Sequence, residues 1–225
     1  MIEIVSVQVL GWEAAIRGMR NPMNSWDKSD SFQCFEDQHC EECHNYNGGS
    51  CFTIGENDLE LMKKLSWSGP DHGKFMRMIT VTCDIIAPLY WWKEFDTYKV
   101  GTVANSCSTM HKIHSKEFTM DDFSFEHIID EYLDYYSPNT LTQKIVKCLN
   151  ECREKFLETK DKTYWWQMIQ LLPSSYNQKR TVQLNYAVLK NIYHARKNHK
   201  LDEWHEFCRM IENLPHAEEL IVGEE

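Results

Sequence analysis

The chain has 225 residues, 42% of them hydrophobic and 26% charged, which is enough to bury the core of one domain. Its formal net charge of −10 excludes the broad basic surface with which proteins bind nucleic acid, although a few converging cations suffice for a small anion. No apolar run approaches the ~20 residues that cross a bilayer. The N-terminal segment lacks the basic region of a secretory signal, so we expect a cytoplasmic protein whose nine cysteines are reduced.

The front of the chain predicts a strand, a short helix, a long polar loop and a second helix. Apolar and polar residues alternate in the strand, which is the period of a half-buried β-strand. The loop is rich in Ser, Asn, Asp and Gly, and the second helix follows a cap at Glu56 or Asn57. In chain order the four elements span residues 2–10, 12–19, 21–55 and 57–65.

The predicted loop contains four cysteines and two histidines, which are residues that Zn²⁺ prefers. Cys40 and Cys43 have the spacing of a zinc knuckle, but a second pair of this spacing is missing and the outer spacings are irregular. A structural zinc and free thiols on a flexible loop therefore both remain open. The candidate ligands are Cys34, Cys40, Cys43 and Cys51.

Residues 71–114 are the part around which we expect the chain to be organised. A β-branched apolar run at 78–87, broken by Pro88, predicts a buried strand. It leads into the aromatic block Tyr90-Trp91-Trp92, where we expect one indole ring in the core and the other facing outward. A hydroxyl-rich polar loop at 97–109 follows. The pattern is compatible with a pocket for a planar ligand and with ordinary core packing.

Helical spacing of apolar residues predicts five helices behind this region, separated by proline-containing breaks. The acidic tail at 216–225 is expected to be frayed. Strands near the front and helices behind indicate an α/β (α+β) fold, in one domain spanning 1–225 with a Cys-rich insertion at about 30–55. The five predicted helices span residues 121–136, 140–157, 163–172, 177–197 and 201–214.

The common catalytic signatures are missing, since the sequence contains no P-loop, GxGxxG, GxSxG or HExxH motif. A hydrolase would have to use Ser106 or Cys107 with His111 or His114 as the base. These residues lie close in sequence, but the sequence does not place a base beside a nucleophile.

Two blocks of the chain, one from His72 to Pro88 and one from Leu172 to Arg196, resemble the flavin-dependent thymidylate synthases. In the first, His72 stands where that family has the His of its His-x-Ser/Thr-Pro-Phe-Glu segment. The run Thr-Val-Thr-Cys-Asp-Ile-Ile-Ala-Pro at 80–88 then matches a strand that ends in Ala-Pro. In the second block, residues 172–179 and the helix leading to Arg196 resemble the family's Leu-Pro-x-x-x-x-x-Arg segment and the helix behind it.

The chain departs from the family at its charged positions. Thr97-Tyr98-Lys99 stands at the signature Arg-His-Arg, and Lys179 stands at a phosphate-binding Arg. A lysine neutralises a phosphate but lacks the planar fork of a guanidinium. Thr102 and Cys107 take the places of two serines, and Thr109 takes that of the last Arg.

The resemblance implies a homotetrameric flavoprotein with FAD at subunit interfaces, NADPH and methylenetetrahydrofolate as co-substrates, and a dUMP-like acceptor. The activity it implies is that of an FAD-dependent methyltransferase of the thymidylate synthase type, in nucleotide biosynthesis. Two other functions remain open, namely a non-catalytic nucleotide- or flavin-binding protein and a metal-stabilised interaction protein built around the Cys-rich insertion. Neither nucleic acid nor a membrane is expected as a partner.

By resemblance, His72 is the candidate catalytic residue, because histidines titrate near neutrality and suit a proton relay. The candidate nucleotide-binding residues are Lys99, Thr102, Ser106, Cys107, Thr109, Lys179 and Arg180. The candidate cofactor-binding residues are Lys74, Arg77, Thr97, Tyr98 and Arg196.

Overall fold

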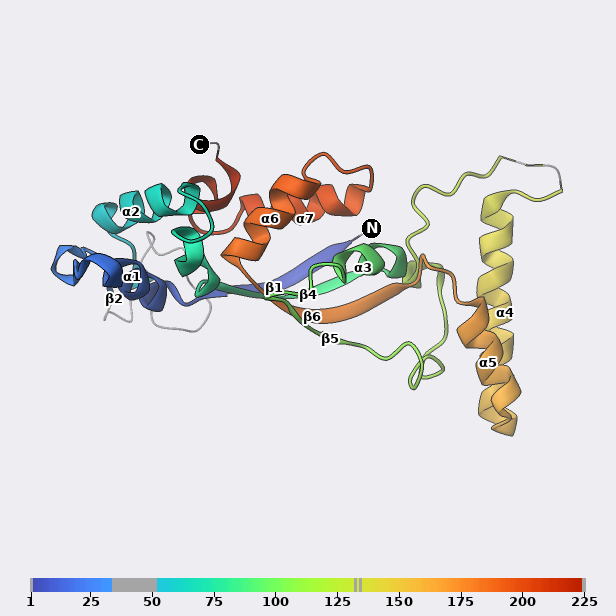
Figure 1. The fold of residues 1–225 in the computed structure, drawn as a ribbon. Helices are drawn as coiled ribbons and strands as arrows, with labels where there is room; N and C mark the ends of the chain where they lie inside the picture. Colours follow the sequence, from blue (N-terminus) through green and yellow to red (C-terminus); the bar gives the residue numbers. More distant parts are fainter. Residues whose placement is uncertain (1, 34–51, 132, 134, 224–225) are drawn as a thin grey trace. The chain divides into compact units, whose positions relative to one another are not determined.

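The computed structural model of the chain describes residues 2–33, 52–131, 133 and 135–223, which form a mixture of helices and strands (Figure 1). The α-helices are α1 Trp12–Arg20, α2 Glu56–Trp67, α3 Leu89–Phe95, α4 Pro138–Thr159, α5 Lys162–Leu171, α6 Tyr186–Arg196 and α7 Asp202–Glu212. The strands are β1 Glu3–Leu10, β2 Phe32–Gln33, β3 Phe52–Thr53, β4 Thr80–Pro88, β5 Val103–Ser106 and β6 Asn177–Asn185. This composition confirms the predicted α/β (α+β) class.

Four of the strands form one sheet in the order β1-β4-β6-β5, and β2 pairs with β3 in a small antiparallel ribbon. Along β4, Val81, Cys83, Ile85 and Ala87 are buried while the residues between them are half-buried. This period of two places one face of the strand in the core, as the sequence predicts. Burial raises the pKa of the Cys83 thiol to about 12, so this cysteine stays protonated.

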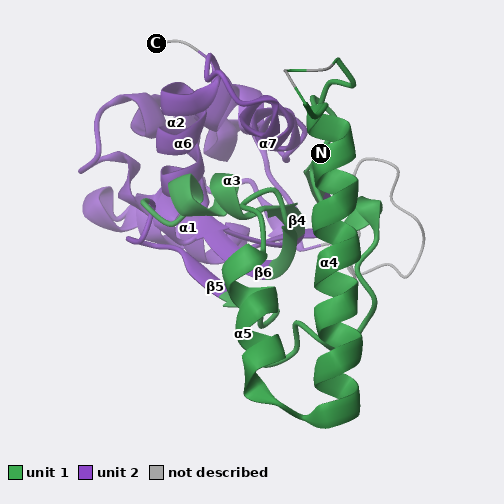
Figure 2. Ribbon diagram, turned by 90° about the vertical axis from the view of Figure 1, so that its right-hand side faces the viewer, with its two compact units in different colours: residues 1–3, 85–97, 105–180 green, residues 4–84, 98–104, 181–225 purple. Residues whose placement is uncertain are grey.

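The chain divides into two compact units, coloured green and purple in Figure 2. Unit 1 comprises residues 1–3, 85–97 and 105–180, and unit 2 comprises residues 4–84, 98–104 and 181–225. The chain passes from one unit to the other inside β1, β4, β5 and β6, and once between α3 and β5. The single domain expected from the sequence stays a prediction, and each unit is described by itself.

Unit 1 contains α4 and α5, which pack on each other and have well-formed N-caps. The Ser137 hydroxyl accepts a hydrogen bond from the Thr140 N–H, and the Asp161 carboxylate accepts one from the Thr163 N–H. Both helices occur within a few residues of their predicted positions. Their apolar faces close a core of Ile113, Phe118, Phe123, Val146, Leu149 and Met168.

The segment 121–136 is not the helix that the sequence predicts. A single 3-10 turn at Met120–Asp122 is closed by Thr119 and Asp122, and irregular backbone follows it. The chain then pairs with another segment, since the Ser124 N–H donates to the Ser175 carbonyl and Phe123 bridges to Tyr176. These long-range backbone hydrogen bonds replace the i to i−4 bonds of a helix.

The single helix predicted for 177–197 is also wrong, because its first half is strand β6. Val182 and Leu184, two residues apart, are buried on one face of this strand. Val182 and Tyr186 are four residues apart, which is also the spacing of one helix face. The helix begins only after Asn185, whose side chain accepts a hydrogen bond from the Val188 N–H. The spacing of apolar residues fits a helix and a strand equally well. Residues 177–185 form a strand because they hydrogen-bond to β4 and β5 in the sheet.

The C-terminal segment does not fray within the described residues. Glu218–Val222 forms one π-helical turn, and Ala217, Leu220 and Ile221 are buried. Burial of these aliphatic side chains holds the segment on unit 2.

Both rings of Trp91 and Trp92 are fully buried, which corrects the expectation that one of them faces outward.

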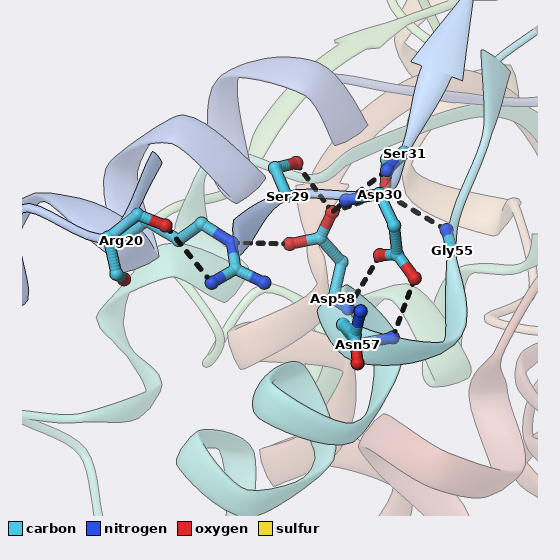
Figure 3. A network of polar contacts seen from close by, with 8 residues as sticks. Arg20, Ser29, Asp30, Ser31, Gly55, Asn57 and Asp58 are labelled. Carbon is cyan, nitrogen blue, oxygen red and sulfur yellow. Dashed lines mark hydrogen bonds and ion pairs between the residues drawn. The ribbon is translucent and has the colours of Figure 1, made fainter. Parts of the chain in front are cut away.

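A buried ion pair anchors the base of the Cys-rich insertion (Figure 3). The Arg20 guanidinium lies 2.6 Å from one carboxylate oxygen of Asp58, and the other oxygen accepts hydrogen bonds from the hydroxyls of Ser29 and Ser31. Burial alone would raise the pKa of Asp58, but the hydrogen bonds from the two serines and from Arg20 lower it below its ordinary value. The contacts of Asp58 with Arg20, Ser29 and Ser31 connect helix α2 to the segment before β2.

Helix α2 receives its cap from outside its own first turn. Gly55 occupies the cap position, and the Asp30 carboxylate accepts hydrogen bonds from the N–H groups of Asn57 and Asp58. The cap predicted at Glu56 or Asn57 is therefore wrong, because an aspartate distant in sequence supplies the acceptor.

No helix in the described part of the chain has the length and apolarity to cross a membrane.

Candidate functional site

The aromatic wall of unit 1 is formed by Trp91, Trp92 and Phe95 on helix α3. The two indole rings meet edge to face at 4.9 Å, and Phe95 stacks on Trp91 at 5.1 Å. The Trp92 N–H donates to the Gln178 carbonyl at 2.9 Å. The wall is therefore a closed core, with an edge fixed to strand β6.

Arg180 covers this wall. Its guanidinium lies 4.2 Å from the centre of the Trp92 ring, and it donates to the Asp96 carboxylate at 2.7 Å and to the Gln178 side chain at 3.0 Å. The carboxylate balances the charge of the guanidinium. Arg180 is consequently engaged in a structural ion pair and a cation–π contact.

The loop after β5 is attached to the same strand. The Cys107 N–H donates to the Lys179 carbonyl at 2.9 Å, and the Gln178 amide donates to the Cys107 carbonyl at 2.6 Å. Ser106, Cys107 and Lys179 have exposed side chains beside these backbone bonds, and Thr109 is half-buried. The structure thus brings four of the predicted nucleotide-binding residues onto neighbouring segments.

A hydrolytic pair is not formed among these residues. The His111 backbone is held by the Ser108 hydroxyl, and the His114 ring packs edge to face on Phe156 at 4.9 Å. Within the described part of the chain neither imidazole hydrogen-bonds to Ser106 or Cys107. The geometry does not support a nucleophile with an adjacent base.

In unit 2, two predicted cofactor-binding residues meet although they lie 98 positions apart. The Arg196 guanidinium donates to the Tyr98 hydroxyl at 2.9 Å. It also faces the Trp204 ring at 4.9 Å, and the Tyr98 and Trp204 rings lie 6.0 Å apart, edge to face. This cluster holds the Arg196 guanidinium against two aromatic rings, of which Trp204 is fully buried.

The segment between Tyr98 and β5 approaches the start of α6 closely. Gly101 has a φ of 76°, and a Cβ placed on it would lie 2.9 Å from the Asn185 amide nitrogen, so a larger residue would strain the backbone and displace the Asn185 side chain. Next to it the Thr102 hydroxyl is buried and has no hydrogen-bond partner within the described residues.

A cavity of about 500 Å³ also lies in unit 2. Its polar groups include Arg77, Lys190 and His194, and no carboxylate is among the described residues that line it. Of the predicted residues only Arg77 lines it, whereas His72 and Lys74 are exposed at the 3-10 helix Gly73–Arg77. The full lining consists of Ser66, Trp67, Gly69, Pro70, Gly73, Met76, Arg77, Ala187, Lys190, Asn191 and His194.

Sequence reasoning missed Trp67, Lys190 and His194 as pocket residues. Lys190 and His194 are four apart and therefore share one face of α6, a signal that the sequence contains. Trp67 ends α2, and no local pattern connects it to a helix more than 100 residues later. Only the tertiary structure brings these residues together.

The predicted site residues fall in both units, and their roles stay predictions. Lys99 and Thr97 are exposed, and the Thr97 hydroxyl donates to the Glu94 carbonyl at 2.7 Å. Unit 1 contains Thr97, Ser106, Cys107, Thr109, Lys179 and Arg180. Unit 2 contains His72, Lys74, Arg77, Tyr98, Lys99, Thr102 and Arg196.

The proposed zinc ligands Cys34, Cys40, Cys43 and Cys51 lie outside the described residues. Within residues 2–33, 52–131, 133 and 135–223, no group of three or more His, Cys, Asp or Glu side chains is placed to hold a metal ion. The cysteines of these ranges are all free thiols.

The sequence matches no protein-family model, and no curated protein shows significant similarity to it. The fold does match solved structures. A crystal structure of the flavin-dependent thymidylate synthase ThyX from Helicobacter pylori, complexed with FAD and dUMP, superposes with a TM-score of 0.65 at 15% identity over 97% of both chains. A second ThyX structure from the same organism, also with FAD and dUMP, gives 0.63 at 14% identity over 98% of this chain and 97% of that one.

A third match is the UMP/dUMP methylase PolB from Streptomyces cacaoi, bound with 5-Br dUMP. It has a TM-score of 0.55 at 14% identity and covers 94% of this chain and 88% of that one. These likenesses establish the fold. The chain has the fold of the flavin-dependent thymidylate synthases. The fold that the two sequence blocks predicted is therefore confirmed.

Proposed function

We propose that the chain is a flavin-dependent enzyme of the thymidylate synthase type, which transfers a one-carbon unit reductively to a dUMP-like pyrimidine deoxynucleotide. The observation that carries this proposal is the fold match, over 97% of both chains, to a ThyX structure that contains FAD and dUMP. The sequence blocks around His72 and Lys179 support the same activity independently of the fold.

The residues of unit 2 fit a flavin or nucleotide in two respects. Arg196 places a planar cation beside the half-buried Tyr98, which suits an anionic ligand. The buried Thr102 hydroxyl would gain its missing hydrogen bond from such a ligand. Both features are the kind of orienting contact that a cofactor enzyme supplies.

When bound, FAD would supply hydride chemistry, with NADPH as the reductant and methylenetetrahydrofolate as the one-carbon donor. The chain's own residues would bind and orient these molecules. Lys99 and Lys179 would neutralise phosphate, and the exposed His72 would relay a proton. We further propose a cytoplasmic homotetramer, whose mass light scattering coupled to gel filtration would measure.

The first test is flavin content. We expect purified protein to show the visible absorption band of a flavin, or to acquire it when titrated with FAD. A colourless protein that takes up no added FAD would refute flavin chemistry. The second test is release of tritium from C5 of labelled dUMP, with methylenetetrahydrofolate and NADPH present, because methylation at C5 displaces that hydrogen.

A non-catalytic nucleotide- or flavin-binding protein is the second candidate. The observation that favours it is the ion pair between Arg180 and Asp96, which leaves one predicted cation already neutralised. FAD uptake without tritium release would select this candidate. Stoichiometric zinc by elemental analysis would instead support a metal site in the Cys-rich insertion.

A further inference from the structure

Helix α4 of unit 1 carries two cysteines one turn apart, Cys148 and Cys152. Residues four apart share one face of a helix, and the Cys152 thiol lies in hydrogen-bonding contact with that of Cys148. The other described cysteines lie on separate elements, Cys83 in β4, Cys107 directly after β5 and Cys208 in α7. The two thiols of α4 therefore form a pair of neighbouring sulfur ligands.

The pair is sheltered on one side and accessible on the other. Cys152 packs against the core of unit 1, to which Leu149 of α4 and Met168 of α5 belong. Both cysteine side chains are half-buried rather than enclosed. A small ion can therefore reach the two sulfurs while the apolar core keeps water from one side of them.

The two sulfurs disfavour each other as anions. Burial raises the pKa of the Cys152 thiol, and the charge of Cys148, its hydrogen bond and the charge of Glu151 raise it further. A cation between the sulfurs replaces this repulsion by attraction, which is how a metal displaces thiol protons. The exposed Lys144, four positions before Cys148, adds a positive charge on the same face of α4.

The spacing decides between a disulfide and a bridging ion. On a helix the Cβ atoms of residues four apart lie about 5–6 Å from each other, whereas a disulfide needs about 3.5–4.5 Å. The pair therefore cannot close a disulfide without distorting α4. An ion bonded to both sulfurs at about 2.3 Å spans up to about 4.6 Å, a separation that sulfurs one bond beyond these Cβ atoms can adopt.

The number of ligands selects the metal. A structural zinc takes four ligands, but among the described residues no third His, Cys, Asp or Glu side chain is placed with this pair to hold a metal ion. Soft thiolates select copper(I), whose filled d shell accepts two ligands in a line. Two sulfurs without a third ligand therefore suit copper(I) better than zinc.

We propose that Cys148 and Cys152 form a two-coordinate binding site for copper(I). One copper(I) ion replaces the two thiol protons, which are released to solvent, and two copper–sulfur bonds form. Copper is neither oxidised nor reduced in this step, and the occupied site carries one negative charge. The inference is independent of the proposed function, since no predicted nucleotide- or cofactor-binding residue takes part.

The experiment measures copper(I) affinity by competition with a chromophoric copper(I) chelator under anaerobic conditions. It uses the wild-type chain and a parent chain in which the four cysteines of the insertion are replaced by serine. In both chains Cys148→Ser should remove one bound copper(I) ion. In the parent, Cys148→Ser and Cys152→Ser should each weaken binding roughly 100-fold or more, because the second ligand of a bidentate site acts at high effective concentration.

Two further measurements report on the ligands themselves. X-ray absorption of the copper-loaded parent should show two sulfur neighbours. The affinity should rise about 100-fold per pH unit as long as both thiols are protonated, because binding releases two protons. Circular dichroism establishes that each variant is folded.

Glu151→Gln is the matched control, because this exposed carboxylate directly precedes Cys152 and lies three positions after Cys148. Its charge raises the pKa of the Cys152 thiol, so its removal eases loss of the proton. We therefore expect Glu151→Gln to bind copper(I) as tightly as the parent or more tightly.

The proposal is overturned if the parent chain does not compete with the chelator, or if both serine variants of α4 keep the affinity within about 3-fold. Loss through Glu151→Gln as large as through Cys148→Ser would also overturn it, since the carboxylate would then be a ligand. Failure of the proposed function looks different. In that case FAD uptake or tritium release is missing, and neither of these measurements involves copper(I).

Discussion

The two units differ in the partners of their predicted cations. In unit 1 the predicted cation Arg180 is paired with Asp96, and one cavity is lined by three glutamates and Lys147. In unit 2 the predicted cation Arg196 donates to the Tyr98 hydroxyl. One cavity of this unit contains Arg77 and Lys190, and another contains three glutamates. A formal net charge of −10 describes neither unit, because binding depends on which charges converge and which are already paired.

The largest effect that we expect concerns the buried ion pair of unit 2. Asp58→Asn should lower the free energy of unfolding by about 3–5 kcal/mol, because it leaves the Arg20 charge buried without its counter-ion. Denaturant titration measures this. Glu13→Gln, which removes the exposed partner of Arg17, serves as the control and should cost less than about 1 kcal/mol. If both variants lowered the free energy of unfolding equally, burial would not distinguish the Arg20–Asp58 pair from the exposed Arg17–Glu13 pair.

The same carboxylate should make stability depend on pH. The folded-state pKa of Asp58 lies below its ordinary value of 3.8, so its contribution is present above that pH and is lost as the pH falls through the folded-state pKa. Asp58→Asn should therefore flatten the acid limb of the stability–pH curve. If the acid limb is unchanged in this variant, other carboxylates cause the loss of stability at low pH.

A core substitution in each unit tests whether the two units unfold together. Leu149→Ala in unit 1 and Leu189→Ala in unit 2 each empty a fully buried site and should cost about 2–5 kcal/mol. If the chain is one cooperative domain, both variants shift a single transition monitored by fluorescence and circular dichroism. Two separate transitions, each sensitive to one variant, would refute the single domain predicted from the sequence.

Lys99 in unit 2 and Lys179 in unit 1 form a matched pair of exposed lysines. If both meet the nucleotide phosphate, Lys99→Ala and Lys179→Ala should each weaken dUMP by about 1.5 kcal/mol, roughly tenfold, and leave deoxyuridine unchanged. Calorimetry with both ligands measures the difference. Equal loss for dUMP and deoxyuridine would show that the lysine in question does not contact the phosphate.

The smallest effect is expected at the cation–aromatic cluster. Tyr98→Phe keeps the ring near Trp204 but removes the hydroxyl that accepts from Arg196, which should cost about 1 kcal/mol of stability. Tyr135→Phe, at a side chain that is 88% exposed, should be neutral. A neutral Tyr98→Phe would indicate that the hydrogen bond to Arg196 contributes nothing.

Much of the fold could be predicted because local patterns were unambiguous. Strand β4 is rich in β-branched residues and ends at Pro88, and α4 has a serine cap before a long amphipathic stretch. In contrast, 177–185 carries apolar residues that fit both a helix and a strand. The segment 121–136 has helical spacing, but its backbone hydrogen-bonds to residues near 175. Local pattern cannot choose between structures when a distant partner supplies the hydrogen bonds.

The sequence by itself determined the residue types of the site and the resemblance of its two blocks to a known family. It could not determine which charges would be free to bind, since Arg180 and Asp96 are 84 positions apart and Tyr98 and Arg196 are 98 apart. Only the tertiary structure decided these pairings and placed Lys190 over Trp67. The reason is physical, because Coulombic and stacking energies depend on distance in space rather than on separation along the chain.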